Sequence, residues 1–257
     1  MSLLEVAGLT VRFGGHLAVN DVYLDADEGG VTGLIGPNGA GKTTTFNALC
    51  GVVTPSGGRI AFAGQPIQKL STHRRARLGI SRTFQRLEVF GSLTARENIL
   101  VGGEIRRSWS RLGAPHPQLL AGDQQPASLE AEVDLIVERL GLGAVAGVRV
   151  GTLPTGQARL VELGRALAAR PRLLLLDEPA SGLDEAETTD FGVLLRELAS
   201  AGLAILLVEH DVPLVMSVCD RISVLDFGQV IASGTAAEVQ ANQAVLDAYL
   251  GTAGGVG

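Results

Sequence analysis

The sequence predicts an α/β fold with a mostly parallel sheet at its centre. Two observations lead to this fold class. Short apolar runs bounded by turn-forming residues recur along the chain, as expected of strands that are buried on both faces of a parallel sheet. Segments with helical spacing of apolar residues separate these runs, which is the alternation of a βαβ chain. The expected strands are Val31–Ile35, Leu173–Leu176, Ala204–Val208 and Ile222–Leu225, and the expected helices are Lys42–Leu49, Glu185–Leu198 and Pro213–Val218.

The start of the chain departs from this alternation. Leu3–Phe13 and Val19–Asp25 alternate apolar and polar residues in part, and Gly14 and Gly15 lie between them. Such a pattern around a glycine turn is typical of a β-hairpin. We therefore expect an antiparallel hairpin, or part of a small side sheet, before the parallel sheet begins.

The middle of the chain predicts a helical insertion. Thr94–Val101, Leu129–Leu140 and Gln157–Ala169 have helical periodicity. Glu104–Ser128 is rich in Pro, Gly and Gln and contains Trp109, so we interpret it as a long surface loop. We expect one domain over residues 1–257, with a helical subdomain at about 86–160 and a frayed end at 251–257.

Composition sets limits on the class of protein. The chain has 257 residues and 46% hydrophobic content, which is enough for a sizeable core. The net charge of −6 disfavours a nucleic-acid partner, because phosphate backbones call for a basic face. Cys50 and Cys219 have apolar neighbours and form no C-x-x-C pair. We expect both to be reduced core residues in a reducing compartment.

No targeting or membrane-spanning segment is expected. The first residues lack the basic start and apolar stretch of a signal peptide. The longest apolar runs, Leu173–Leu176 and Leu203–Val208, are far shorter than the ~20 residues that span a bilayer. Any membrane role must therefore come through a partner.

The strongest chemical signal is a glycine-rich turn between an expected strand and an expected helix. It fits G-x-x-x-x-G-K-[ST] at every fixed position. The glycines let N–H groups converge on phosphate oxygens, and the following helix adds the positive end of its dipole. Lys42 should reach the β- and γ-phosphates of ATP, and Thr43 should ligate Mg²⁺. The residues expected to bind the nucleotide are Gly36, Pro37, Asn38, Gly39, Ala40, Gly41, Lys42, Thr43 and Thr44.

A second signal follows the apolar strand Leu173–Leu176. This strand delivers Asp177 and Glu178 at its C-terminal end, where α/β sheets bind ligands. Beside a P-loop, Asp177 is expected to act on Mg²⁺ through its water shell, and Glu178 to orient or deprotonate the attacking water. Without a P-loop the same pair would be only a solvated loop. His210 follows another strand, and its spacing alone fits a helix cap or surface residue as well as a site residue.

Taken together, these motifs resemble the ATPase domains of the ABC family, and the resemblance covers essentially the whole chain. It implies a P-loop NTPase (RecA-like) core with a mostly parallel sheet, an N-terminal antiparallel β subdomain and an inserted helical subdomain. The matching positions, in the family's order, are the P-loop, Gln85, Leu153–Gln157, Asp177, Glu178, Ser181–Asp184 and His210.

The resemblance also gives roles to single residues. Phe13 looks like the aromatic residue that stacks on adenine. Gln85 looks like the residue that senses the γ-phosphate and Mg²⁺, and His210 like the switch histidine that contacts the γ-phosphate. Mg²⁺ would then be held by Thr43, Gln85 and Asp177.

Two ATPase domains of this family pair head to tail, so the resemblance implies a dimer with a second copy or a similar subunit. Thr155, Gly156 and Gln157 would act in the partner's site. Pro154 departs from the family's pattern, which usually has Ser there, because Pro has neither a hydroxyl nor an N–H. Pro also suits the start of a helix, and Thr155 could supply a hydroxyl instead. Our hypothesis is that this chain completes its partner's site poorly while its own site is competent.

Three stretches narrow the resemblance to the larger ATPase subunit of branched-chain amino-acid importers. They are residues 13–20, the basic run at 73–85 and the C-terminal stretch at 245–251. The basic run also fits a solvated face, and the C-terminal stretch also fits an amphipathic helix docked on the core. ATPase subunits of lipid or lipopolysaccharide exporters share much of the same pattern and stay an alternative.

The expected function is therefore ATP hydrolysis that powers transport, with ATP and Mg²⁺ as cofactors. The implied partners are permease subunits, which would dock near Gln85–Val101, and a separate substrate-binding protein. The implied location is peripheral, on the cytoplasmic face of the membrane. A soluble ABC ATPase of DNA repair or translation would carry coiled coils or zinc modules, and a GTPase would carry N-K-x-D; the sequence has none of these. Glu178 argues against nucleotide binding without hydrolysis.

Overall fold

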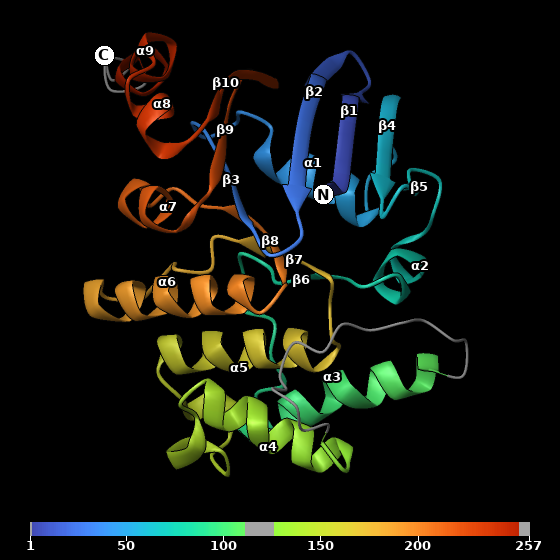
Figure 1. The fold of residues 1–257 in the computed structure, drawn as a ribbon, viewed down its shortest axis with the longest axis vertical. Coiled ribbons are helices and arrows are strands. Elements are labelled where there is room, and N and C mark those ends of the chain that lie inside the picture. The colour runs from blue at the N-terminus through green and yellow to red at the C-terminus, as the bar shows by residue number, and fades with distance from the viewer. Residues whose placement is uncertain (1, 111–125, 252–257) are drawn as a thin grey trace.

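The computed structural model describes residues 2–110 and 126–251. Its smaller sheet is antiparallel, with the strand order β2-β1-β4-β5 (Figure 1). The first two strands form the predicted hairpin, in which Phe13 lies opposite His16 across the glycine turn. The strands are β1 (Ser2–Phe13), β2 (His16–Asp27), β4 (Gly57–Phe62) and β5 (Gln65–Pro66).

The larger sheet has the order β10-β9-β3-β8-β7-β6, and all of its neighbours are parallel except β9 and β10. Every residue of β3, β7 and β8 is buried. This double-sided burial explains why β8 and the first four residues of β7 are continuous apolar runs rather than alternating ones, whereas β3 also buries Thr32 and Gly33. All four predicted strands are confirmed. The strands are β3 (Val31–Ile35), β6 (Ile80–Arg82), β7 (Leu173–Asp177), β8 (Ala204–Val208), β9 (Arg221–Asp226) and β10 (Gln229–Gly234).

Six helices belong to the part of the chain around these sheets. Local sequence fixes several of their starts: α6 begins with a capping box of Asp184 and Glu187, and Asp211 caps α7. The last helix packs Val245 and Tyr249 against the core beside β10. The helices are α1 (Lys42–Cys50), α2 (Thr72–Arg77), α6 (Glu185–Ser200), α7 (Val212–Val218), α8 (Ala236–Gln240) and α9 (Gln243–Gly251).

A separate layer of helices lies on the far side of α6 from the larger sheet (Figure 1). It contains α3 (Ala95–Ser110), α4 (Leu129–Arg139) and α5 (Thr155–Ala168). Two short 3₁₀ turns, Gly143–Val145 and Val150–Thr152, connect α4 to α5. The described residues between β6 and β7 therefore form the helices of the predicted insertion.

The predicted loop Glu104–Ser128 is wrong at its start, because α3 continues to Ser110 and includes Trp109. The structure shows why Gly102 and Gly103 do not break this helix. A Cβ atom on Gly102 would overlap the carbonyl oxygen of Arg165 on α5, and one on Gly103 would overlap the side chain of Leu129 on α4. The two glycines allow α3 to pack closely on both neighbours. Residues 111–125 of the predicted loop, and 252–257 of the predicted tail, lie outside the described residues.

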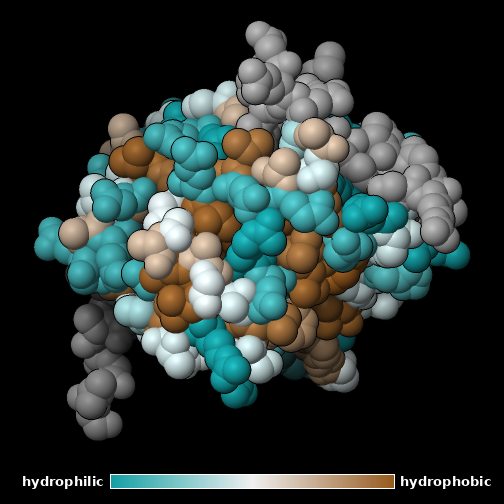
Figure 2. All heavy atoms as spheres, turned by 90° about the horizontal axis from the view of Figure 1, so that it is seen from below, coloured by the Kyte–Doolittle hydropathy of each residue, from teal (hydrophilic) through white to brown (hydrophobic). Residues whose placement is uncertain are grey.

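The outer face of the helical layer carries hydrophobic patches between hydrophilic side chains (Figure 2). Among the exposed large hydrophobic residues, Leu135 lies on α4 and Val148 lies in the connection between α4 and α5. Within residues 2–110 and 126–251, no helix combines the length and the apolar character needed to cross a membrane. Both cysteines are free thiols, and Cys50 is buried as predicted. Burial raises the pKa of Cys219 to about 12, so its thiol is protonated at neutral pH.

Candidate functional site

The phosphate-binding loop connects β3 to α1 and is shaped by glycines in unusual backbone conformations. Gly36, Gly39 and Gly41 have φ angles of 149°, 81° and 105°. A Cβ atom on Gly36 would overlap the carbonyl oxygen of Leu225, and one on Gly41 would lie 2.7 Å from the carbonyl oxygen of Ala18. Gly36 and Gly41 therefore require glycine both for conformation and for space, whereas Gly39 requires it for conformation alone.

The start of α1 offers N–H groups to an anion. Gly41 is the N-cap of this helix and makes no side-chain capping hydrogen bond. The first N–H groups of a helix have no intrahelical acceptor, so they remain available to phosphate oxygens. Asn38 and Gly39 are exposed at the tip of the loop, and so is Thr43 in the first turn. The geometry is that of an open phosphate cradle.

Lys42 lies across this cradle. Its Nζ atom donates hydrogen bonds to the carbonyl oxygens of Gly36 and Pro37, at 2.7 and 2.9 Å. Burial lowers the pKa of Lys42, while the charges of Glu178 and Asp177 act in the opposite direction. The ammonium group therefore sits between the P-loop and the two carboxylates that the sequence predicts to act with it.

Asp177 and Glu178 lie at the C-terminal end of β7, at the same sheet edge as the P-loop. The Asp177 side chain is buried, and its Oδ2 accepts a hydrogen bond from Arg82 at 2.7 Å. Glu178 has a φ of 48°, which is uncommon for a residue other than glycine, and its N–H is tied to the carbonyl oxygen of Val208 at 2.8 Å. The backbone thus turns sharply at Glu178 and exposes its side chain to the site.

Three predicted residues meet around one carboxylate oxygen. The Nε2 atom of Gln85 donates to Oε2 of Glu178 at 2.8 Å. The Nδ1 atom of His210 lies 3.9 Å from the same oxygen. The His210 side chain is 64% exposed, so it can turn toward a ligand in the site. The structure therefore brings together Gln85, Glu178 and His210, which lie on three different segments of the chain.

Glu209 was missed by the sequence analysis. It is 1% exposed, and its Oε1 accepts the N–H of Ala180 at 2.8 Å while its Oε2 accepts the N–H of His210 at 2.9 Å. One buried carboxylate thus connects the turn after Glu178 to the segment that carries His210. The sequence pattern that could have identified Glu209 is its position directly after a buried strand, at the end of the sheet where ligands bind.

Arg159 and Glu162 on α5 were also missed. Arg159 donates to the carbonyl oxygens of Phe84 and Gln85, at 3.0 and 2.6 Å. Glu162 accepts the N–H of Glu88 at 3.2 Å. Burial raises the pKa of Glu162, and the Glu88 N–H and the Arg159 charge oppose that rise. The helix that follows the predicted signature segment therefore holds the backbone around Gln85.

Two aromatic residues that bear on the site, Phe13 and Tyr249, lie near opposite ends of the chain. Phe13 ends β1 and is 52% exposed, as a ring that stacks on a ligand must be. Tyr249 on α9 is partly buried in the core, and its pKa is raised by burial and lowered in part by a hydrogen bond with the Gly36 backbone. The C-terminal helix thus reaches the first glycine of the phosphate loop.

The predicted signature segment lies away from this cluster. Pro154 is the N-cap of α5, and Thr155 and Gly156 form its first turn. Pro154 and Thr155 are exposed, Gln157 is partly exposed and Gly156 is buried. A Cβ atom on Gly156 would overlap the carboxylate of Glu187 on α6. Thr155 and Pro154 are therefore free to meet another molecule.

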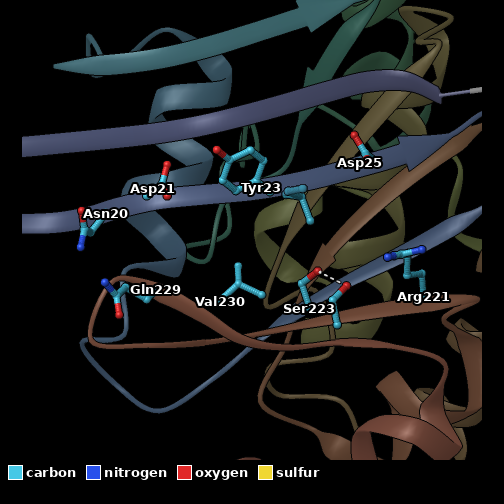
Figure 3. A pocket seen from close by; sticks show the side chains of 10 residues that line it. Asn20, Asp21, Tyr23, Asp25, Arg221, Ser223, Gln229 and Val230 are labelled. Carbon is cyan, nitrogen blue, oxygen red and sulfur yellow. Dashed lines mark hydrogen bonds between the residues drawn. The ribbon is translucent and has the colours of Figure 1, made fainter.

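A different hollow, with a volume of about 470 Å³, lies between β2 and the β9–β10 hairpin (Figure 3). It is mostly polar: Tyr23 and Asp25 line it from β2, and Arg221 and Ser223 from β9. None of the predicted site residues lines it. The candidate site is instead the open edge at the C-terminal ends of β3, β7 and β8.

Comparison with known proteins shows the family of the chain. The model of a family described as ABC transporter matches residues 19–181. The chain belongs to the ABC transporter family. Its ATPase fold is shared by a solved structure of MJ1267, an ATP-binding cassette of an ABC transporter in its ADP conformation, with a TM-score of 0.84, 28% identity, and coverage of 98% of this chain and 99% of that one. A nucleotide-free ATP-binding cassette matches with a TM-score of 0.83 and 28% identity, over 97% of this chain and 99% of that one.

Curated ABC transporter relatives match over nearly the full length. The chain is 43% identical to BraF of Pseudomonas aeruginosa, a high-affinity branched-chain amino acid transport ATP-binding protein, with 98% of both chains covered. It is 34% identical to LptB of Haemophilus influenzae, a lipopolysaccharide export system ATP-binding protein, with the same coverage. A second model, described as branched-chain amino acid ATP-binding cassette transporter, matches residues 229–254. As a member of this family, the chain binds nucleotide and is a transporter ATPase.

Proposed function

We propose that this chain is the ATP-hydrolysing subunit of an importer of branched-chain amino acids. The observation that carries the proposal is its 43% identity to BraF over 98% of both chains, which exceeds the 34% identity to LptB. The C-terminal match at residues 229–254 to the branched-chain amino acid transporter model supports the same substrate class. We also propose that residues 1–257 form one ATPase domain, with its helical subdomain at about 86–160.

In this function the P-loop residues, Gly36 to Thr44, hold the phosphates of ATP. Lys42 exchanges its carbonyl partners for β- and γ-phosphate oxygens, and Phe13 stacks on the adenine ring. The hydroxyl of Thr43, the amide oxygen of Gln85 and the carboxylate of Asp177 are hard oxygen donors of the kind that Mg²⁺ takes. When bound, Mg²⁺ neutralises charge on the β- and γ-phosphates. The donor set therefore fits the metal.

Glu178 is the residue proposed to act on the attacking water. It orients the water in line with the γ-phosphorus and takes up its proton, while the bond between that phosphorus and the β–γ bridging oxygen breaks to release ADP and phosphate. Gln85, 2.8 Å from Glu178, holds the carboxylate until the γ-phosphate arrives. His210 then contacts the γ-phosphate from the neighbouring strand.

The signature segment is proposed to act in a second subunit. Thr155, Gly156 and Gln157 begin α5, whose N-terminus presents positive dipole to a partner's γ-phosphate. Pro154 replaces the hydroxyl and N–H that Ser would provide there. We therefore propose a head-to-tail dimer, with a second copy or a similar subunit, in which this chain completes the partner's site less well than a Ser-containing chain does.

The membrane partner is proposed to dock between the core and the helical layer. A groove of about 270 Å³ lies there, and its lining is mostly apolar. Ile105 and Trp109 line it from α3, and Phe84 lines it from the segment before Gln85. Permease subunits, with a separate substrate-binding protein, would place the chain at the cytoplasmic face of the membrane.

The test is ATP hydrolysis by the purified wild type beside Glu178→Gln, with the dimer followed by size-exclusion chromatography in ATP and Mg²⁺. We expect turnover by the wild type, and a stalled, ATP-bound dimer of the variant. Glu185→Gln, an exposed carboxylate on α6, is the matched control and should behave as the wild type. Hydrolysis by Glu178→Gln at the wild-type rate would refute the assignment of Glu178 to the attacking water.

The substrate class is tested by leucine uptake after reconstitution with the permease subunits. A complex that exports lipid instead would overturn the assignment to import.

A further inference from the structure

Arg82 occupies a central position that neither the motifs nor the proposed chemistry explains. It ends β6, beside the strand that carries Asp177. One arm of its guanidinium donates to Oδ2 of Asp177 at 2.7 Å, and the other donates to Oδ1 of Asn47 on α1 at 2.6 Å. The side chains of Arg82 and Asp177 are 9% and 4% exposed. A buried fork thus connects the metal-side carboxylate to the helix that follows the P-loop.

The same guanidinium also faces the proposed docking groove. Its central carbon lies 4.9 Å from the centre of the Phe84 ring and 5.7 Å from that of Phe46. Both Arg82 and Phe84 line the groove, and Phe84 is 44% exposed there. A partner that covers Phe84 would therefore displace the ring against the guanidinium of Arg82, which is the group that also binds Asp177.

We propose that Arg82 is a positioning residue that fixes the Asp177 carboxylate for the metal ion and connects the docking groove to that carboxylate. The inference rests on the proposed function, because it takes Asp177 as the carboxylate on the Mg²⁺ side. The planar fork of Arg holds two partners at fixed angles, which the single ammonium of Lys cannot do. With Oδ2 engaged by Arg82, the orientation of Oδ1 is set.

Arg82 could affect metal binding through its positive charge or by orienting Asp177. The two effects on metal binding have opposite signs, so an experiment can separate them. As a cation near the site, Arg82 repels a metal ion, and its removal by charge alone would tighten metal binding. As a positioning residue, it favours metal binding, and its removal would weaken it. Arg82→Lys keeps the charge and loses the fork, whereas Arg82→Gln loses both.

The experiment measures Mn²⁺ binding to the full chain by electron paramagnetic resonance, with ATP present, and ATP binding separately in EDTA. We expect Arg82→Lys and Arg82→Gln each to weaken Mn²⁺ binding by about tenfold or more, the usual effect of losing a residue that orients a metal ligand. ATP affinity in EDTA should be unchanged. The control is Arg77→Gln, which removes an exposed cation on α2 and should match the wild type. Asn47→Ala, which breaks only the arm away from Asp177, should weaken Mn²⁺ binding less than Arg82→Gln.

Two results would overturn the positioning role. One is Arg82→Lys binding Mn²⁺ like the wild type while Arg82→Gln binds it more tightly, which is the result of charge alone. The other is unchanged Mn²⁺ binding in both variants when thermal melting shows that they are folded. A wild type that binds no ATP refutes the proposed function and this inference with it, whereas normal ATP and Mn²⁺ binding by all variants refutes only the inference.

The connection to the groove is tested by a double-mutant cycle with Phe84→Ala. If the ring acts through Arg82, Phe84→Ala changes Mn²⁺ binding in the wild-type background and leaves it unchanged in the Arg82→Gln background. Additive effects of the two substitutions would refute the connection.

Discussion

A buried ionic cluster joins the helical layer to the turn before β7. Glu132 on α4 is 2% exposed and receives two hydrogen bonds from Arg106 on α3, at 2.8 and 2.6 Å. Arg170, in the turn before β7, donates two more at 2.6 and 2.9 Å. One carboxylate thus satisfies two guanidinium groups from different parts of the fold, and Glu132→Gln is the perturbation that tests it.

The expected cost follows from burial. Glu132→Gln keeps the shape but leaves Arg106, which is 8% exposed, beside a neutral amide. Removing one partner from a buried ion pair typically costs about 3–5 kcal/mol, because the remaining charge is uncompensated. For a protein of this size, 1 kcal/mol corresponds to about 2–4 °C in Tm, so the melting temperature should fall by about 6–20 °C.

Thermal and urea unfolding provide the assay, and Asp134→Asn provides the control. Asp134 lies on α4, like Glu132, and pairs with Arg96 on α3 at 2.7 Å, but its side chain is 61% exposed. An exposed pair contributes about 0–1 kcal/mol, so the control should change the free energy of unfolding little. If Glu132→Gln unfolds at the same urea concentration as Asp134→Asn, the reasoning from burial is wrong.

The same cluster predicts a dependence on pH. Burial by itself would raise the pKa of Glu132, but the hydrogen bonds and charges of Arg106 and Arg170 together lower it below its usual value. A carboxyl group whose pKa is lower in the folded state stabilises the fold above its unfolded pKa of about 4.3, and this stabilisation is lost as the pH falls through the folded pKa. The stability difference between wild type and Glu132→Gln should therefore shrink below about pH 4.3. A difference that stays constant to pH 3 would contradict this account.

Three further predictions concern the nucleotide site. Pro154→Ser should raise ATP hydrolysis by the assembled complex, and an unchanged rate would count against a weakened signature. Glu209→Gln should lower the rate of hydrolysis by about tenfold or more and leave the ATP affinity unchanged, because a hydrogen bond to a charged group contributes about 1.5–3 kcal/mol. Hydrolysis at the wild-type rate would show that Glu209 has no part in the site. Gly36→Ala should abolish ATP binding measured by calorimetry, since its Cβ would overlap the Leu225 carbonyl, whereas Gly143→Ala has open space and should bind normally.

The sequence by itself determined β3, β7, β8 and β9, the phosphate loop, and the positions of Asp177 and Glu178 after a strand, but not the three-residue strand β6. These features are local. The burial of β7 and β8 on both faces favours continuous apolar runs, and a P-loop needs its glycines and lysine at fixed spacing. Such constraints act between residues that are close in the chain, so they can be read without the fold.

The helix α3 shows where local signals fail. Gly102 and Gly103, with a Pro- and Gly-rich stretch after them, favour a loop by propensity. The helix continues through both glycines, which pack against its neighbours: a Cβ atom on Gly102 would overlap the carbonyl oxygen of Arg165 on α5, and one on Gly103 the side chain of Leu129 on α4. Packing, rather than intrinsic propensity, decides its length.

Only the tertiary structure decided how the site residues are held. Gln85 donates to Glu178 across 93 positions of sequence, and Arg82 to Asp177 across 95. No periodicity or spacing relates such partners, because the contact depends on which strands become neighbours in the sheet. The sequence indicates which groups are candidates for the chemistry. The order of strands β6, β7 and β8 brings Arg82, Asp177 and His210 to one edge.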